Sequence, residues 1–203
     1  GAWGGLGRAF QDRMEGRFEI SALGRPDLDI SRRNDVFARV REFQPEVLVN
    51  AAGVSDPDAC EIEKWQAYLS NRDGAKHLAA AAAEVNALLV QPSTDMIFDG
   101  AKSTPYREED PPNPLSIYAD TKLAGELAVM NGAPRHLVVR TGWLFGPRGT
   151  NFLKQLLEKR QTEEVVFAFE DQRSQPTHQY DFVDAVLELV KRNETGVWHI
   201  ANS

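Results

Sequence analysis

Cysteine is almost absent from the sequence, since Cys60 is the single one among 203 residues. One cysteine forms neither an internal disulfide nor a cysteine-rich metal cluster, so a disulfide-stabilised secreted scaffold is excluded. The four histidines, His77, His136, His178 and His199, also lack the spacing of metal ligands. We therefore expect no metal site, and we assign the protein to a reducing cytoplasm.

Long apolar runs and an excess of positive charge are also missing. The nearest candidate for a membrane span, residues 78–90, is interrupted by Glu84 and Asn86 and is too short to cross a bilayer, and no signal peptide is visible. With 23 Lys and Arg against 30 Asp and Glu, the chain carries a formal charge of -7, which disfavours non-specific nucleic-acid binding. The lack of a G-x-S-x-G elbow argues against a serine hydrolase. We predict neither a membrane nor a nucleic-acid partner.

Strand-like and helix-like segments alternate along the chain, of which 42% is hydrophobic. Apolar runs predict extended segments at residues 18–23, 47–49, 87–90, 137–139, 165–169 and 197–200. Helical spacing predicts helices near residues 8–13, 36–43, 72–85, 117–130, 152–157 and 182–190, the second with Ser31 as its N-cap. The alternation predicts an α/β fold with a doubly wound parallel sheet and helices on both faces.

The ends of the sequence are abrupt. Gly1 lies inside what looks like a glycine-rich turn, and the chain stops at Ser203. We expect a fragment of a longer natural chain, in which the first strand and a C-terminal substrate-binding part are incomplete. An authentic start codon immediately before Gly1 would contradict this expectation.

Tyr118 and Lys122 are the most informative pair of residues. Four positions apart in an expected helix, they share one helix face. A free phenol titrates near ~10, and a neighbouring ammonium lowers that pKa because it favours the phenolate. The pair is therefore suited to acid/base work on a carbonyl or alcohol oxygen. The alternative is a surface tyrosine beside a solvated lysine.

Gly1, Gly4 and Gly7 form a G-x-x-G-x-x-G pattern just before an expected helix. Glycines let the backbone approach a pyrophosphate, and the helix N-terminus favours its negative charge. The pattern is equally compatible with an ordinary glycine loop.

Arg25 follows the expected strand at residues 18–23, where dinucleotide sites choose between cofactors. An arginine there receives a 2′-phosphate, so we expect NADP(H), with NAD(H) as the alternative. Asp29 and Ile30 are expected to flank the adenine. The competing interpretation of Arg25 is a solvated surface side chain.

Ser93 and Thr94 come directly after a buried run that we expect to be a strand. Hydroxyl groups at such a strand end donate hydrogen bonds to a substrate oxygen as it gains negative charge. The alternative is that they cap a turn or helix. The hydroxyls favour chemistry mainly because Tyr118 and Lys122 follow downstream.

These pieces occur in the order used by a known family. The sequence resembles the extended short-chain dehydrogenase/reductase family, and within it most closely the dTDP-4-dehydrorhamnose reductases. The resemblance is carried by residues 1–7, 49–52, 69–71, 93–95, 140–143, 151–152, 171–172 and 176–177, and by Tyr118-x-x-x-Lys122-x-x-x-Glu126. The ordered set extends over nearly the whole chain.

The resemblance implies roles for individual residues. Tyr118 would protonate a keto oxygen, Lys122 would bind the nicotinamide ribose and lower the tyrosine pKa, and Thr94 would donate a hydrogen bond to the reacting oxygen. With the residues argued above, the cofactor-binding set is Gly1, Gly4, Gly7, Arg25, Asp29, Ile30, Ala51, Ala52, Gly53, Asn71, Tyr118 and Lys122. The substrate-binding set is Ser93, Thr94, Tyr118 and Trp143.

The resemblance also implies an activity. The protein would be an NADP(H)-dependent reductase of a nucleotide-linked 4-keto-deoxysugar, and it would form a homodimer. Residues 1–203 would make a single NAD(P)-binding Rossmann-type domain, with parts of a small substrate-binding lobe at about 145–180 and at the C-terminal end.

Two other functions stay open on the sequence. Residues 105–110 are similar to those of the regulatory subunit of methionine adenosyltransferase, which acts by binding a partner, whereas residues 140–143 are more typical of a reductase. An epimerase or dehydratase of the same fold is the other alternative.

Three residues depart from the family pattern. Met96 stands where the reductases usually carry a tyrosine that contacts the sugar, Trp3 replaces a small or polar residue, and Ser174 replaces a common glycine. The family pattern therefore does not fix the sugar.

Overall fold

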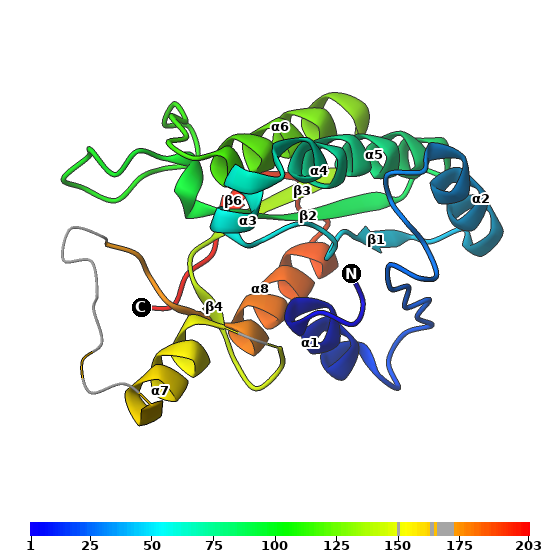
Figure 1. Ribbon diagram of the computed structural model, residues 1–203. Helices are drawn as coiled ribbons and strands as arrows, with labels where there is room; N and C mark the ends of the chain where they lie inside the picture. Colours follow the sequence, from blue (N-terminus) through cyan, green and yellow to red (C-terminus); the bar gives the residue numbers. More distant parts are fainter. Residues whose placement is uncertain (150, 163–164, 166–172) are drawn as a thin grey trace.

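The computed structural model describes residues 1–149, 151–162, 165 and 173–203 (Figure 1). Its centre is a parallel sheet in the order β1 (Val47–Val49), β2 (Leu88–Thr94), β3 (His136–Thr141) and β6 (Gly196–His199). Two short strands, β4 (Leu144–Phe145) and β5 (Thr177–His178), form a second parallel sheet. The predicted α/β arrangement is thus present.

Helices cover both faces of the main sheet, as predicted (Figure 1). One face carries α2 (Arg33–Phe43), α5 (Ala75–Glu84) and α6 (Ile117–Gly132), and the other carries α1 (Gly5–Met14) and α8 (Gln179–Lys191). The remaining helical segments are α3 (Pro57–Ile62), α4 (Lys64–Tyr68), the π-helix η1 (Leu69–Gly74), the 3-10 helix η2 (Asp95–Ile97) and α7 (Phe152–Thr162).

The sheet residues alternate between two apolar clusters, because successive side chains of a strand point to opposite faces. Leu89 and Val138 pack toward α2, α5 and α6, while Val90 and Leu137 pack toward α1 and α8. Both strands that supply these residues are buried on both sides, which is typical of the central strands of a parallel sheet.

The sequence of α6 fixes its start and its close approach to the neighbouring chain. Ser116 is the N-cap, and its hydroxyl accepts a hydrogen bond from the N–H of Ala119. Gly125 lies so near η1 that a Cβ there would stand 2.3 Å from the carbonyl oxygen of Asn71. Cap and glycine together determine where the first two turns of α6, with Tyr118 and Lys122, meet the sheet.

Two local predictions are wrong. Residues 18–23 form no strand: none of the described strands pairs with the segment, and Leu23 accepts backbone hydrogen bonds only from Gly1 and Ala2. A run with strand propensity becomes a strand only where a ladder partner exists. Ser31 is not the N-cap of α2, because its hydroxyl donates to Asp29 instead.

One further prediction cannot be compared. The extended segment expected at residues 165–169 lies outside the described residues, except for Val165. The other predicted strands and helices are present with boundaries shifted by a few residues, and α3, α4 and the small β4–β5 sheet were not expected.

Candidate active site

Tyr118 and Lys122 lie in the first turns of α6, next to the carboxyl end of β2. The ammonium of Lys122 donates a hydrogen bond of 2.8 Å to the carbonyl oxygen of Pro92. An ammonium has three N–H donors, so this bond leaves two for other acceptors. Lys122, which the sequence predicts to be catalytic, therefore joins α6 to the end of β2.

Burial sets the protonation of this pair. It raises the pKa of Tyr118 to about 12, an effect that the negative charges of Asp95 and Cys60 reinforce and a hydrogen bond from Thr94 partly offsets. Burial also lowers the pKa of Lys122 to about 8, against the opposing charge of Glu126. The expected lowering of the tyrosine pKa is absent because desolvation of the phenolate, together with the charges of Asp95 and Cys60, outweighs the effect of Thr94.

Thr94 is the last residue of β2, and its hydroxyl makes hydrogen bonds within the turn that follows. Its Oγ1 accepts a hydrogen bond of 3.2 Å from the N–H of Met96 and donates a long one of 3.3 Å to Oδ1 of Asp95. Because the bond to Asp95 is long, the hydroxyl proton is weakly held. Thr94 therefore retains a donor for a substrate oxygen.

Ser93, the residue before Thr94, is also buried. Its hydroxyl oxygen has no hydrogen-bond partner among the described residues. A buried polar atom without a partner is uncommon and points to a ligand or a functional constraint. Ser93 thus stays a candidate for substrate contact.

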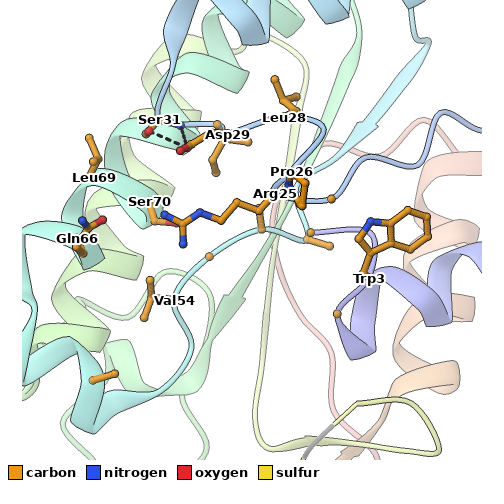
Figure 2. Close-up of a pocket in the computed structure, with 18 of the residues that line it drawn as sticks. Trp3, Arg25, Pro26, Leu28, Asp29, Ser31, Val54, Gln66, Leu69 and Ser70 are labelled. Carbon is orange, nitrogen blue, oxygen red and sulfur yellow. Dashed lines mark hydrogen bonds between the residues drawn. The ribbon is translucent and has the colours of Figure 1, made fainter.

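A cavity of about 940 Å³ adjoins the glycine turn (Figure 2). Its lining includes eight of the residues predicted to bind a cofactor, namely Gly1, Gly4, Arg25, Asp29, Ile30, Ala51, Ala52 and Gly53. A Cβ on Gly1 would lie 2.1 Å from the backbone of Ala51, so only glycine fits there. The backbone of the turn is therefore exposed to the cavity at close range, as pyrophosphate binding requires.

Gly7 and Asn71 do not line this cavity, and their contacts are structural. A Cβ on Gly7 would lie 2.3 Å from the carbonyl oxygen of Gly1, so this glycine lets α1 pack against the turn. The Asn71 amide donates to the carbonyl of Val54 and to Oγ1 of Thr121, and its oxygen accepts from the N–H of Val54. Asn71 thereby holds the cavity wall against the helix of Tyr118.

Arg25 lines the cavity, and in Figure 2 its side chain extends between Trp3 and Ser70 and points toward Ser70. It also lines a second cavity of about 580 Å³. The neighbouring Asp29 accepts hydrogen bonds from the hydroxyl and the N–H of Ser31, which lower the pKa of its carboxyl. A guanidinium that lines the cavity is suited to a phosphate, which it binds bidentately.

Trp143 is the expected substrate-facing residue, and its backbone is strained. Its φ is +37°, a conformation that bulky residues rarely adopt and that clusters at functional sites. The indole packs edge-on against Phe152, with ring centroids 4.3 Å apart, and keeps 36% of its surface exposed. Part of the ring is thus free for contact with another molecule.

Several polar contacts near the site were not predicted from the sequence. Asn50 donates a hydrogen bond of 2.8 Å to Gln91, which joins the loop after β1 to β2. Ser174, in the segment before β5, donates one of 2.6 Å to Asp95 in η2. Neither contact could be predicted from spacing, because each joins residues that are distant in sequence. Ser174 was singled out in the sequence only because it replaces a glycine that is common in the family.

Two further features bear on the expected partners, and both concern the residues that the structure describes. Within them, no three His, Cys, Asp or Glu side chains are grouped to hold a metal ion. Likewise, none of the helices seen there is long and apolar enough to cross a membrane.

Comparison with known proteins decides the family. The family described as RmlD substrate binding domain matches residues 1–203. The chain belongs to this family. A dTDP-4-dehydrorhamnose reductase from Sinorhizobium fredii is 36% identical over 192 residues, covering 91% of the chain and 65% of that protein. A dTDP-4-keto-6-deoxy-D-glucose reductase from Streptomyces niveus is 37% identical, covering 98% and 70%.

A solved structure of an RmlD-family protein is similar throughout the chain. The dTDP-4-dehydrorhamnose reductase of Bacillus anthracis, in complex with NADP, matches with a TM-score of 0.96 at 32% identity, covering 100% of this chain and 73% of that one. The resemblance to the reductases and the Rossmann-like fold are thereby confirmed. The chain spans 65% to 73% of the length of these three relatives.

Proposed function

We propose that the chain carries the cofactor site and the catalytic residues of an NADP(H)-dependent reductase that acts on a nucleotide-linked 4-keto-deoxysugar. The observation that carries the proposal is the meeting of Thr94, Tyr118 and Lys122 at one strand end. There the Lys122 ammonium donates to the Pro92 carbonyl, and the Thr94 hydroxyl lies close enough to Tyr118 to lower the pKa of its phenol. A glycine-lined cavity formed by neighbouring loops lies at the same end of the sheet.

The residues present fit a dinucleotide. The glycine turn offers backbone at close range for the pyrophosphate, Asp29 and Ile30 line the adenosine end, and Arg25 is available to a 2′-phosphate. When bound, NADPH would supply the hydride that reduces the keto carbon. The same cavity supports NAD(H) as the alternative cofactor, which does not use the Arg25 charge.

The protein side of the reaction is a proton transfer. Tyr118 holds its proton firmly because its pKa is about 12, so at neutral pH it is the acid that protonates the keto oxygen as the carbon is reduced. Thr94 donates a hydrogen bond to the same oxygen while negative charge develops on it. Lys122 has two free N–H donors for ribose hydroxyls, and its pKa of about 8 suits it to return a proton to the phenolate.

The substrate class rests on the names of relatives and on one wall of the site. Two relatives are named as reductases of different dTDP-linked keto-sugars, which supports the class and leaves the sugar open. Trp143 presents half-exposed indole surface suited to an apolar sugar face. Met96, which departs from the family pattern, lies next to Thr94 and is the position we expect to tune sugar choice.

The two rival functions are less well supported. A regulatory subunit that only binds a partner needs no half-buried tyrosine–lysine pair, and the matches reported above bear reductase names. An epimerase or dehydratase would return its cofactor unchanged after each turnover. Net consumption of NADPH separates reduction from both rivals.

Assembly and location belong to the same proposal. We propose a homodimer, supported by the large apolar side chain of Trp65 on α4, which is 65% exposed and does not line the cofactor cavity. We also propose a cytoplasmic protein whose partner is the nucleotide-sugar rather than a nucleic acid or a membrane, in line with its acidic charge. Light scattering of the purified protein tests the dimer, and a monomer at all concentrations contradicts it.

The experiment for the activity is a cofactor-oxidation assay on the complete protein. NADPH absorbance is followed with a panel of nucleotide-linked 4-keto-sugars, and the product is identified by mass. We expect stoichiometric oxidation of NADPH and a product heavier by two hydrogens. An altered sugar without net NADPH loss would indicate an epimerase or dehydratase, and no change on any sugar would favour the regulatory role.

A further inference from the structure

Ser174 links the hydrogen bonds at the end of β2 to the segment that leads into β5. Its hydroxyl donates to Oδ2 of Asp95 over 2.6 Å, while Oδ1 of the same carboxylate accepts the Thr94 hydroxyl over 3.3 Å. A bond from a hydroxyl to a carboxylate is strong at the shorter distance and weak at the longer one. Asp95 is thus bound mainly by Ser174.

The small sheet places Ser174 in this position. The segment that carries it leads into β5, which pairs with β4, and the N–H of Thr177 donates to the carbonyl of Trp143. Gly142 lies directly beside the bond, because a Cβ there would stand 2.6 Å from both Asp95 Oδ2 and Ser174 Oγ. A side chain at position 142 would displace one of the two partners.

The hydrogen bond from Ser174 to Asp95 affects how readily the Thr94 hydroxyl can donate to a substrate. To donate to a keto oxygen, the Thr94 hydroxyl must release Asp95, and the free energy needed depends on how strongly that carboxylate attracts the proton. A carboxylate that already accepts a short bond from Ser174 attracts it less. Without Ser174, Asp95 would be free to turn toward Thr94 and hold its proton more firmly.

We propose that Ser174 is a positioning residue that keeps the Thr94 hydroxyl available to the reacting oxygen by occupying Asp95. The inference rests on the proposed reductase function for its kinetic consequence. The pKa of Tyr118 measures the availability of this hydroxyl independently of turnover, because Thr94 lowers the pKa of the phenol when its hydroxyl can donate to the phenolate. The charged or titratable groups that act on this phenol are Asp95 from η2 and Cys60 from α3, with Lys122 one turn along its own helix.

The kinetic test compares Ser174→Ala, Ser174→Gly and Ser174→Thr in the complete protein. We expect the first two to lower kcat by about tenfold, the equivalent of one hydrogen bond, with little change in KM for NADPH. Ser174→Thr, which keeps the hydroxyl, should recover most of kcat. The matched control is Ser103→Ala in an exposed loop, which should leave kcat unchanged.

A purely structural anchor predicts a different pattern. If Ser174 only fastened its loop, Ser174→Ala would raise KM for the sugar and leave kcat unchanged. That result overturns the proposal. Equal loss of kcat in Ser174→Thr and Ser174→Ala would overturn it as well.

The second readout needs no substrate. Tyrosines are replaced by the more acidic 3-fluorotyrosine, the signal of position 118 is assigned with Tyr118→Phe, and its titration is followed by fluorine NMR. We expect a higher midpoint in Ser174→Ala than in the parent protein, because the phenolate loses a donor, and no change in Ser103→Ala. Identical midpoints overturn the proposal even if no keto-sugar is turned over, so failure of the reductase function is distinguishable from failure of this inference.

Discussion

The ammonium of Lys122 donates to the carbonyl oxygen of Pro92 across 2.8 Å, joining the second turn of α6 to the last residues of β2. Tyr118 lies one turn earlier on the helix, and Thr94 lies two residues later on the strand. One hydrogen bond thus fixes the relative position of the three residues to which we assign the chemistry.

The lowered pKa of Lys122 predicts how stability depends on pH. In the unfolded chain lysine titrates near 10.5, and in the folded chain near 8, so between these values the unfolded chain holds a proton that the folded chain has released. The free energy of unfolding should therefore rise by on the order of 1–3 kcal/mol from about pH 7 to about pH 10 through this group.

Urea unfolding of the parent protein and Lys122→Met at several pH values measures this rise. The variant should lack this contribution, because it has no buried amine to charge. Above pH 10 Tyr118 has the opposite effect on stability, because its pKa of about 12 means that the phenol ionises first in the unfolded chain. The pH values of the unfolding experiment therefore stay below 10. A parallel pH dependence in both proteins would contradict the prediction.

A buried ion pair supports the same helix. Arg140 on β3 donates to both carboxylate oxygens of Glu126, at 2.8 Å in the shortest contact, and both side chains are at least 92% buried. Arg140→Met should cost about 3–5 kcal/mol of unfolding free energy, since it leaves a buried carboxylate uncompensated. Denaturant unfolding measures the loss.

The double variant Arg140→Met with Glu126→Leu should recover most of that loss, because no buried charge remains. As a matched control, Arg192→Met removes an exposed pair with Glu188 and should cost less than about 1 kcal/mol. A cost at Arg140 no larger than at Arg192 would show that the pair is unimportant for folding.

Arg25 should decide between the two cofactors. Arg25→Ala is expected to weaken NADPH binding by about tenfold or more, the value of a charge-assisted hydrogen bond, and to leave NADH binding nearly unchanged. Calorimetric titration measures both, with Arg107→Ala in an exposed loop as control. Equal weakening of both cofactors would instead assign Arg25 to the shape of the cavity.

Much of the fold was predictable because its signals are local. Apolar runs such as β2 and the spacing of α6 follow from side-chain periodicity, which a single chain displays. The strand expected at residues 18–23 failed because a strand depends on a partner that propensity does not supply. The N-cap at Ser31 failed because Asp29 competes for the same hydroxyl.

In the site, too, the residue types were predictable from the sequence, whereas their surroundings were not. The types and order of Thr94, Tyr118 and Lys122 were readable, since the chemistry restricts which residues can serve. The raised pKa of Tyr118 was not, because it depends on how deeply the phenol is buried. Nor was the link from Ser174 to Asp95, whose residues are far apart in sequence.

The most direct test of the account is NADPH oxidation by Tyr118→Phe, with a nucleotide-linked 4-keto-sugar that the parent protein reduces. The phenylalanine keeps the ring and removes the proton donor. We predict that kcat falls by at least about 100-fold, the usual contribution of a general acid, while NADPH affinity changes by less than about threefold. Turnover close to that of the parent protein would contradict the assignment of Tyr118 as the acid.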